Sequence, residues 1–163
     1  MNNNVEKALA ELDTTYNELV VIAKEITDSD VREIDEIIKY LNDNCDSLSN
    51  EALRQAMVKL SCLSYSFCAK KEQSTFKASL AEIIRKNSYT EEFNKLSGAV
   101  AVKDNLANTK IADKLLVEEL YSLVSNLLKN KLDETHRVID TLKMLLMSRM
   151  NEAKLQQYSD SIS

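Results

Sequence analysis

The chain has 163 residues, 44% of them hydrophobic and 29% charged, with no proline, no tryptophan and a single glycine. Proline and glycine punctuate hairpins and tight loops, so their near absence argues against a β-rich fold and excludes the glycine-rich phosphate loops of nucleotide enzymes. The net charge of −5 is uneven: residues 1–53 carry 4 basic and 13 acidic side chains, whereas residues 54–89 carry 7 basic and 2 acidic ones.

The first elements expected are acidic N-terminal helices over residues 1–46. An apolar ladder with helical spacing begins at Val5 and predicts a helix to about Ile26. The oxygen-bearing side chains of residues 28–30 then predict the cap of a second helix, which should end near Asn44.

A long basic helix is expected next, over residues 49–86. Ser49 is a predicted N-cap, with Leu48 and Leu53 placed as a hydrophobic staple, and Asn87 with Ser88 is the first plausible stop. A capping-box pattern then predicts a short helix over 88–97, which ends at the lone Gly98 in a left-handed conformation.

Residues 99–157 should form a long C-terminal helix with a bend or turn near 129–135, where the apolar register weakens. Its first half carries a four-three ladder typical of a coiled coil. The ladder comprises Val102, Leu106, Thr109, Asp113, Leu116, Leu120, Leu123 and Leu127. The expected fold is therefore all-α, a single domain over 1–163 built as an elongated helical bundle or coiled coil with two very long helices. Apolar stripes that short helices cannot cover favour a homo-oligomer.

Residue types needed for catalysis are scarce. His136 is the only histidine, too few for a helical-bundle metal site and without a marked nucleophile partner. The three cysteines, an odd number, are expected as free thiols used in packing. We expect no enzyme activity, no metal and no cofactor. No apolar window is long enough to span a membrane and the start lacks a signal-peptide pattern, so we expect a protein of the cytoplasm without membrane contact.

The basic middle of the chain is the strongest candidate for a binding function. Lys59, Lys70 and Lys77 fall nearly in line on a continuous helix, and more than half of the aromatic residues lie in or just after this stretch. Cations interleaved with aromatic rings suit single-stranded nucleic acid. The same pattern also fits core aromatics beside an ordinary solvated lysine face.

The acidic N-terminal helices support a competing hypothesis. They predict a helical adaptor or inhibitor that binds a protein partner, with its outermost carboxylates at Asp28, Asp30, Glu33, Asp35 and Glu36. A structural coiled-coil protein, such as a phage assembly component, is a further alternative.

The order of several segments resembles a known family. A lysine-bearing helix with Lys70-Lys71-Glu72 and Lys77-Ala78-Ser79-Leu80 is followed by Tyr89-Thr90-Glu91-Glu92-Phe93, by Leu115-Leu116-Val117-Glu118-Glu119-Leu120-Tyr121 and by Leu142-Lys143. Over roughly residues 65–145 this pattern resembles phage recombination mediators of the UvsY type.

The resemblance implies a non-enzymatic, ring-forming factor in the host-cell cytoplasm that binds single-stranded DNA. It also implies that this factor helps a RecA-like recombinase to replace single-strand-binding protein. No catalytic residue is transferred. The phosphate contacts implied by position are Lys70, Lys71, Lys77, Arg85 and Lys86, and Tyr89 or Phe93 would stack on bases. The acidic first 50 residues have no counterpart in the family and depart from its pattern.

Overall fold

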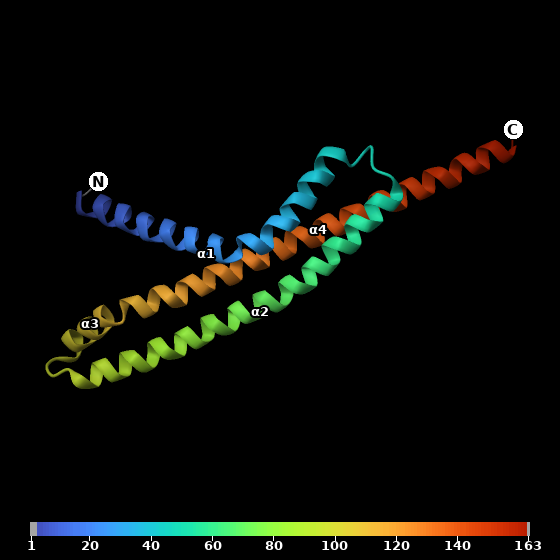
Figure 1. Cartoon of the computed structure of the whole chain (residues 1–163). Coiled ribbons are helices and arrows are strands. Elements are labelled where there is room, and N and C mark those ends of the chain that lie inside the picture. The colour runs from blue at the N-terminus through green and yellow to red at the C-terminus, as the bar shows by residue number, and fades with distance from the viewer. Residues whose placement is uncertain (1–2, 163) are drawn as a thin grey trace. The chain divides into compact units, whose positions relative to one another are not determined.

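The structure, a computed structural model, describes the backbone of residues 3–162 and the side chains of these residues except 3–9, 11, 29, 30 and 162. Figure 1 shows its elements in chain order, α1 (Asn3–Asn44), α2 (Asn50–Lys95), α3 (Val100–Lys110) and α4 (Ala112–Ile162). The predicted all-α fold is confirmed. So is the presence of two very long helices, because α2 has 46 residues and α4 has 51.

The chain forms two compact units. Unit 1 comprises Met1–Asp28 and Ala69–Leu128, and unit 2 comprises Ser29–Cys68 and Lys129–Ser163. Helices α1, α2 and α4 therefore each contribute one segment to each unit. The sequence predicted a single domain, and nothing in it marks this division, because the helices pass from unit to unit without a proline, a glycine or a polar linker.

Unit 2 is built around a core of large aliphatic and aromatic side chains. On its segment of α4 the buried residues are Leu132, Thr135, Ile139, Leu142 and Leu146, which follow the three-four spacing of a coiled-coil seam. The buried hydroxyl of Thr135 donates to the Lys131 carbonyl at 2.7 Å, so the seam contains no unsatisfied polar group at this position. The facing segments of α1 and α2 contribute Ile34, Ile38, Leu41, Leu53, Leu60 and Phe67.

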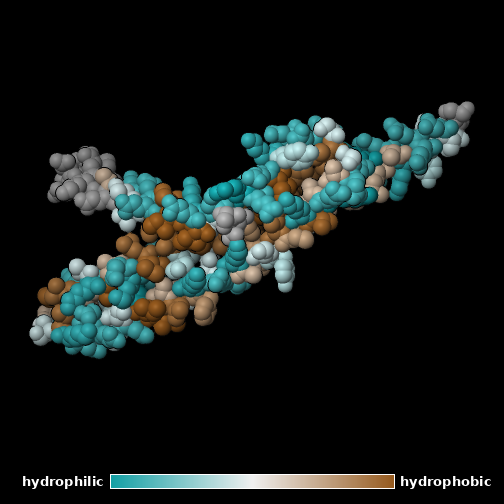
Figure 2. Space-filling model, in the orientation of Figure 1, coloured by the Kyte–Doolittle hydropathy of each residue, from teal (hydrophilic) through white to brown (hydrophobic). Residues whose placement is uncertain are grey.

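Unit 1 has a thinner core made largely of small residues. Its buried hydrophobic side chains are Ala23, Ala81, Ala107, Ile111, Val124 and Leu128. Large apolar side chains such as Leu80 and Ile83 remain half-exposed on the same helices. In Figure 2, brown hydrophobic surface interrupts the teal around α3 and the adjoining end of α2.

The loop between α1 and α2 is closed by Arg149 of α4, within unit 2. One guanidinium nitrogen, Nη1, donates to the Leu48 carbonyl at 2.6 Å, and Nη2 donates to the Cys45 carbonyl at 2.9 Å. Carbonyls at the end of a helix lack intrahelical partners, and a cation there also complements the helix dipole. The loop then ends at Ser49, whose side-chain oxygen accepts the Ala52 N–H at 3.2 Å, so the predicted N-cap is confirmed.

Two predicted helix boundaries are absent. α1 continues through residues 28–30, and α2 continues through Asn87 and Ser88 to Lys95, so the helices expected at 49–86 and 88–97 are one. Nearby hydroxyls bond backward instead of capping: Thr27 donates to the Ala23 carbonyl at 3.1 Å and Thr90 to the Lys86 carbonyl at 3.0 Å. A hydroxyl satisfied in this way leaves the helix intact.

The break in the C-terminal helix lies at Ile111, not near 129–135. Ile111 has φ −108° and ψ 11° and is buried, and Lys114 N–H bonds to its carbonyl at 3.0 Å as α4 begins. Residues 129–135 are continuous α-helix. Isoleucine is only moderately unfavourable in a helix and is no helix breaker, so we attribute this break to the packing of Ile111 in the core of unit 1.

The packed stripe of α3 and α4 is displaced from the predicted ladder. Val102, Leu106 and Leu116 are 41–54% exposed, whereas Ala107 and Ile111 are buried. Four-three spacing is shared by neighbouring stripes of an apolar helix, so spacing alone did not decide which stripe faces the core. The predicted positive φ of Gly98 is confirmed, because its value of +118° lies in the region that only glycine adopts without strain, but α2 ends at Lys95, before the glycine.

Candidate nucleic-acid interface

The predicted DNA-contact residues all lie on α2, but they divide between the units. Lys59 belongs to unit 2, where its Nζ lies 2.9 Å from Glu33. The remaining residues belong to unit 1. Lys59 is therefore held against an acidic residue of the competing surface, and we treat the unit 1 residues as the candidate interface.

Three of the unit 1 cations face carboxylates. Arg85 Nε donates to Glu118 Oε2 of α4 at 2.5 Å, Lys86 lies 2.6 Å from Glu82, and Lys71 lies 2.8 Å from Glu72. The hydrogen bond that Arg85 donates to Glu118 raises the pKa of the Arg85 guanidinium, and the hydrogen bond that Lys86 donates to Glu82 lowers the pKa of Glu82. Exposed pairs such as Lys86–Glu82 contribute little and can exchange for a phosphate, but Arg85 is half-buried and joins α2 to α4.

Lys77 has a different environment. Its ammonium lies 5.3 Å from the centroid of the Tyr121 ring, a cation–π contact that leaves its positive charge unneutralised. Lys70 is also exposed on this segment, and Phe76, adjacent to Lys77, is 69% exposed. Two exposed cations and an exposed ring therefore occur within eight residues of α2.

Tyr89 and Phe93, the predicted base-stacking residues, are half-buried and pack at the corner between α2 and α3. Their rings stack at 5.7 Å, Tyr89 donates to Asp104 at 2.6 Å, and the Lys103 ammonium lies 4.3 Å from the Phe93 centroid. The hydrogen bond to Asp104 raises the pKa of Tyr89. Because both rings have internal partners, stacking on a base would require the corner to rearrange.

The same corner contains a shared carboxylate. Glu92 accepts hydrogen bonds from Lys95 at 2.7 Å and from Lys110 of α3 at 2.9 Å. The hydrogen bond from Lys95 is the larger cause and the one from Lys110 the second, and together they lower the pKa of Glu92 to about 2. The corner of unit 1 is therefore held by charge and ring contacts.

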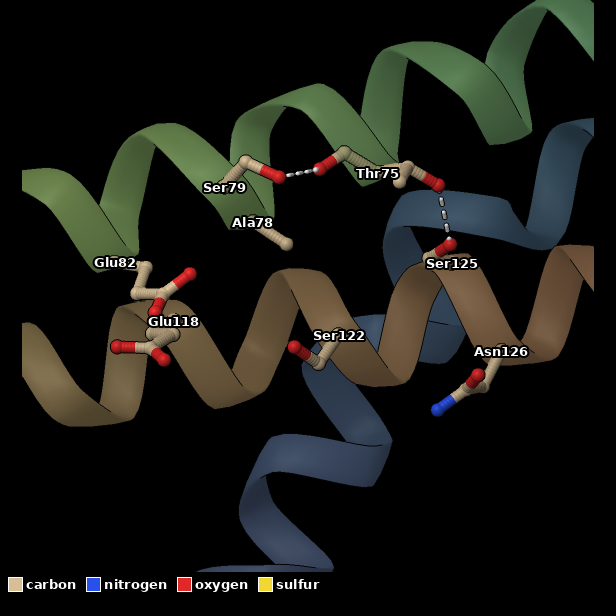
Figure 3. A pocket seen from close by; sticks show the side chains of 8 residues that line it. All are labelled: Thr75, Ala78, Ser79, Glu82, Glu118, Ser122, Ser125 and Asn126. Atoms are coloured by element: carbon tan, nitrogen blue, oxygen red, sulfur yellow. Dashed lines mark hydrogen bonds between the residues drawn. The ribbon is translucent and has the colours of Figure 1, made fainter.

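Small polar side chains line a cavity between α2 and α4 that the sequence did not reveal, shown in Figure 3. Its volume is about 290 Å³. Thr75 and Ser125 share a hydrogen bond of 2.9 Å across it, Ser79 donates to the Thr75 carbonyl at 3.2 Å, and Glu82 and Glu118 lie at the other end. Glu82 and Glu118 are paired with Lys86 and Arg85, so the cavity offers hydroxyls and the one amide of Asn126 without an unpaired carboxylate.

The acidic surface of the competing hypothesis is partly neutralised. Besides the Glu33–Lys59 pair, Asp35 accepts a hydrogen bond from Lys131 of α4 at 2.6 Å. Burial works to lower the pKa of Lys131, but the bonds to Asp35 and Glu134 raise it overall. Asp28 and Glu36 are exposed. The predicted contact at Asp30 lies outside the described side chains, and all these assignments remain predictions.

Features needed for a metal or membrane site are also absent from the described residues. Among the side chains that the structure describes there is no cluster of three or more histidine, cysteine, aspartate or glutamate residues placed to hold a metal. No described helix is long and apolar enough to cross a membrane. The cysteines are free, as predicted, but Cys62 and Cys68 are exposed, so their predicted packing role is wrong. His136 is exposed.

No protein-family model, no curated protein and no solved structure shows significant similarity to this chain.

Proposed function

We propose that this protein is a non-enzymatic accessory factor that binds single-stranded DNA as a homo-oligomer through the basic segment of α2 in unit 1. Its expected protein partners, by the resemblance to UvsY-type mediators, are a RecA-like recombinase and single-strand-binding protein. The observation that carries the proposal is the occurrence of exposed Lys70, Phe76 and Lys77 within eight residues of α2. Lysines contact phosphates and an exposed ring can stack on a base of any type.

The presence of several copies of the segment in an oligomer would strengthen DNA binding. Residues 69–89 carry five basic and two acidic side chains, a modest excess for one chain. Several copies that place the segment along one strand would add their fields and raise the effective concentration of each site. The exposed apolar surface of unit 1 provides a physical reason for such self-association.

The test is fluorescence anisotropy of a labelled single-stranded oligonucleotide, titrated at several salt concentrations. The triple variant Lys70→Ala, Lys71→Ala, Lys77→Ala should bind at least about 10-fold more weakly at low salt. The slope of log affinity against log salt should fall by about 2, since each single-strand phosphate contact contributes about 0.7. Phe76→Ala should weaken binding and leave the slope unchanged, because stacking releases no counterions.

The matched control removes three exposed lysines elsewhere, with Lys39→Ala, Lys129→Ala and Lys154→Ala. It changes the net charge equally and should leave most of the affinity. Equal losses in both triple variants would show that net charge, not this segment, governs binding. An absence of binding by the wild-type protein at low salt would overturn the proposal and favour the protein-adaptor hypothesis.

A further inference from the structure

The first half of α1 carries an apolar stripe that unit 1 covers only at one end. Leu12, Tyr16, Leu19 and Ala23 follow four-three-four spacing and share one helix face. Ala23 is fully buried, and Leu19 is half-buried, but Tyr16 is 56% and Leu12 64% exposed. At Leu12 and Tyr16 the helix therefore presents apolar side chains that the described residues leave largely uncovered. We call the segment over residues 10–22 the arm.

Unit 1 also contains an open apolar groove between α2 and α4. Leu80, Ala81 and Ile84 of α2 and Val117 and Tyr121 of α4 line a cavity of about 350 Å³. Leu80, Ile84 and Val117 are 45–48% exposed there. The remaining lining residues are Lys77 and Lys114, one from each helix, and no carboxylate is among them.

The arm and the groove match in length, chemistry and charge. The stripe from Leu12 to Leu19 and the groove from Lys77 to Ile84 each span seven steps of helix, about 10 Å. At 100° per residue, Asp13 lies about 90° from the middle of the stripe on one side, and Glu18 lies about 130° from it on the other. An apolar helix with a carboxylate on each flank would thus meet an apolar groove with a lysine on each wall.

We propose that the arm of one copy docks in the groove of a second copy. The apolar side chains of the arm and of the groove are both exposed on the same chain, so a single chain does not cover either surface. Ala23 and Thr27, on the same face, are buried and anchor the helix that continues into the arm. The contact joins two different surfaces, so it is heterologous, and repetition produces a ring where the rotation closes and a filament where it does not.

This contact deepens the homo-oligomer of the proposed function by naming the surfaces that join the copies. The contact shares one residue with the proposed DNA-binding segment, since Lys77 also lines the groove. Its other residues are not proposed to contact DNA. The experiment therefore substitutes neither Lys77 nor any other proposed DNA-contact residue, and the mass is measured without DNA.

The experiment determines molar mass by light scattering for the full-length chain and three double variants. Leu12→Ser with Tyr16→Ser makes the stripe of the arm polar, and Ile84→Ser with Val117→Ser makes the groove polar. All four side chains are 47–64% exposed, so the variants should fold, which circular dichroism checks. The control, Met144→Ser with Met147→Ser, alters equally exposed apolar residues of unit 2.

The wild-type protein and the control should be oligomeric, and the arm and groove variants should each have the mass of one chain. An equimolar mixture of these two variants should form a species of two chains, since one intact arm meets one intact groove and neither free end can add another copy. A wild-type chain that stays single at the highest concentration reached, unchanged mass in both variants, or a mixture that stays single would each overturn the proposal. A failure of DNA binding alone would leave it standing.

Discussion

The two units of this protein use different means to hold helices together. The buried hydrophobic residues of unit 2 are all Ile, Leu or Phe, whereas alanine accounts for three of the six in unit 1. Of the 23 large hydrophobic side chains described as exposed, 15 belong to unit 1 and 8 to unit 2. Apolar residues are thus available in unit 1 but are turned outward.

With its smaller core, unit 1 depends more on directional polar contacts, although unit 2 also contains the Glu33–Lys59, Asp35–Lys131 and Arg149 contacts. Arg85–Glu118 and Thr75–Ser125 join α2 to α4, and the corner with α3 depends on Tyr89, Phe93 and Glu92. Such contacts fix geometry while adding little net stability, and they leave apolar surface for another macromolecule. The comparison indicates that unit 2 has the better-packed core, and under the proposed function unit 1 is the part that binds.

The largest expected effect is the difference in stability lost when an isoleucine of each unit is replaced by alanine. Ile34→Ala in unit 2 removes a fully buried side chain and should destabilise the protein by about 2–5 kcal/mol. Ile83→Ala in unit 1 removes a side chain that is 54% exposed and should change the free energy of unfolding by less than about 1 kcal/mol. Urea denaturation followed by circular dichroism measures both, and similar losses would contradict the comparison.

A smaller effect is expected at the loop that Arg149 closes. Arg149→Ala leaves the carbonyls of Cys45 and Leu48 without these donors and should cost about 1–3 kcal/mol. Arg149→Lys keeps the charge but cannot present two nitrogens to two carbonyls, so it should recover only part of the loss. Hydrogen exchange should rise at residues 45–49 in the alanine variant. Unchanged exchange there would show that the loop does not depend on the guanidinium.

The sequence predicted the fold class, the Ser49 cap and the Gly98 turn because each depends on local chemistry. It did not predict the continuity of α1 or α2, since a serine or threonine near a possible boundary either caps a helix or bonds back to the preceding turn. The tertiary packing of Thr27 and of the Tyr89 corner favours the second outcome. The break at Ile111 was unpredictable for a related reason, because only its burial in unit 1 distinguishes it from an ordinary helical residue.

The candidate site was predictable as a charged segment but not as a surface. The basic residues of α2 are visible in the sequence, but their partners are not: Arg85 pairs with Glu118, which lies 33 residues away, and Lys77 lies over the Tyr121 ring. The exposure of Phe76 and the internal stacking of Phe93 depend on which side of α2 faces α4. The helical pattern did not decide this, since apolar residues occur on several sides of α2.

The smallest expected effect is a pH dependence of the Glu92 contacts that hold the corner of unit 1. Glu92 has a pKa of about 2 in the folded protein, below the ordinary value of 4.5, owing to its bonds with Lys95 and Lys110. Because the folded pKa is the lower one, the stabilisation is complete above about pH 4.5 and is lost as the pH falls to about 2.

Carboxyl chemical shifts followed by NMR should give a midpoint near 2 for Glu92, and Lys95→Ala should raise it more than Lys110→Ala. Acid should also increase hydrogen exchange in α3 before it does so around Ile139 of unit 2, because Glu92 joins α3 to α2 through a charged contact, whereas Ile139 packs in a core of buried apolar side chains. A Glu92 midpoint near 4.5, or simultaneous exchange in both regions, would mean that unit 1 is not held by this carboxylate.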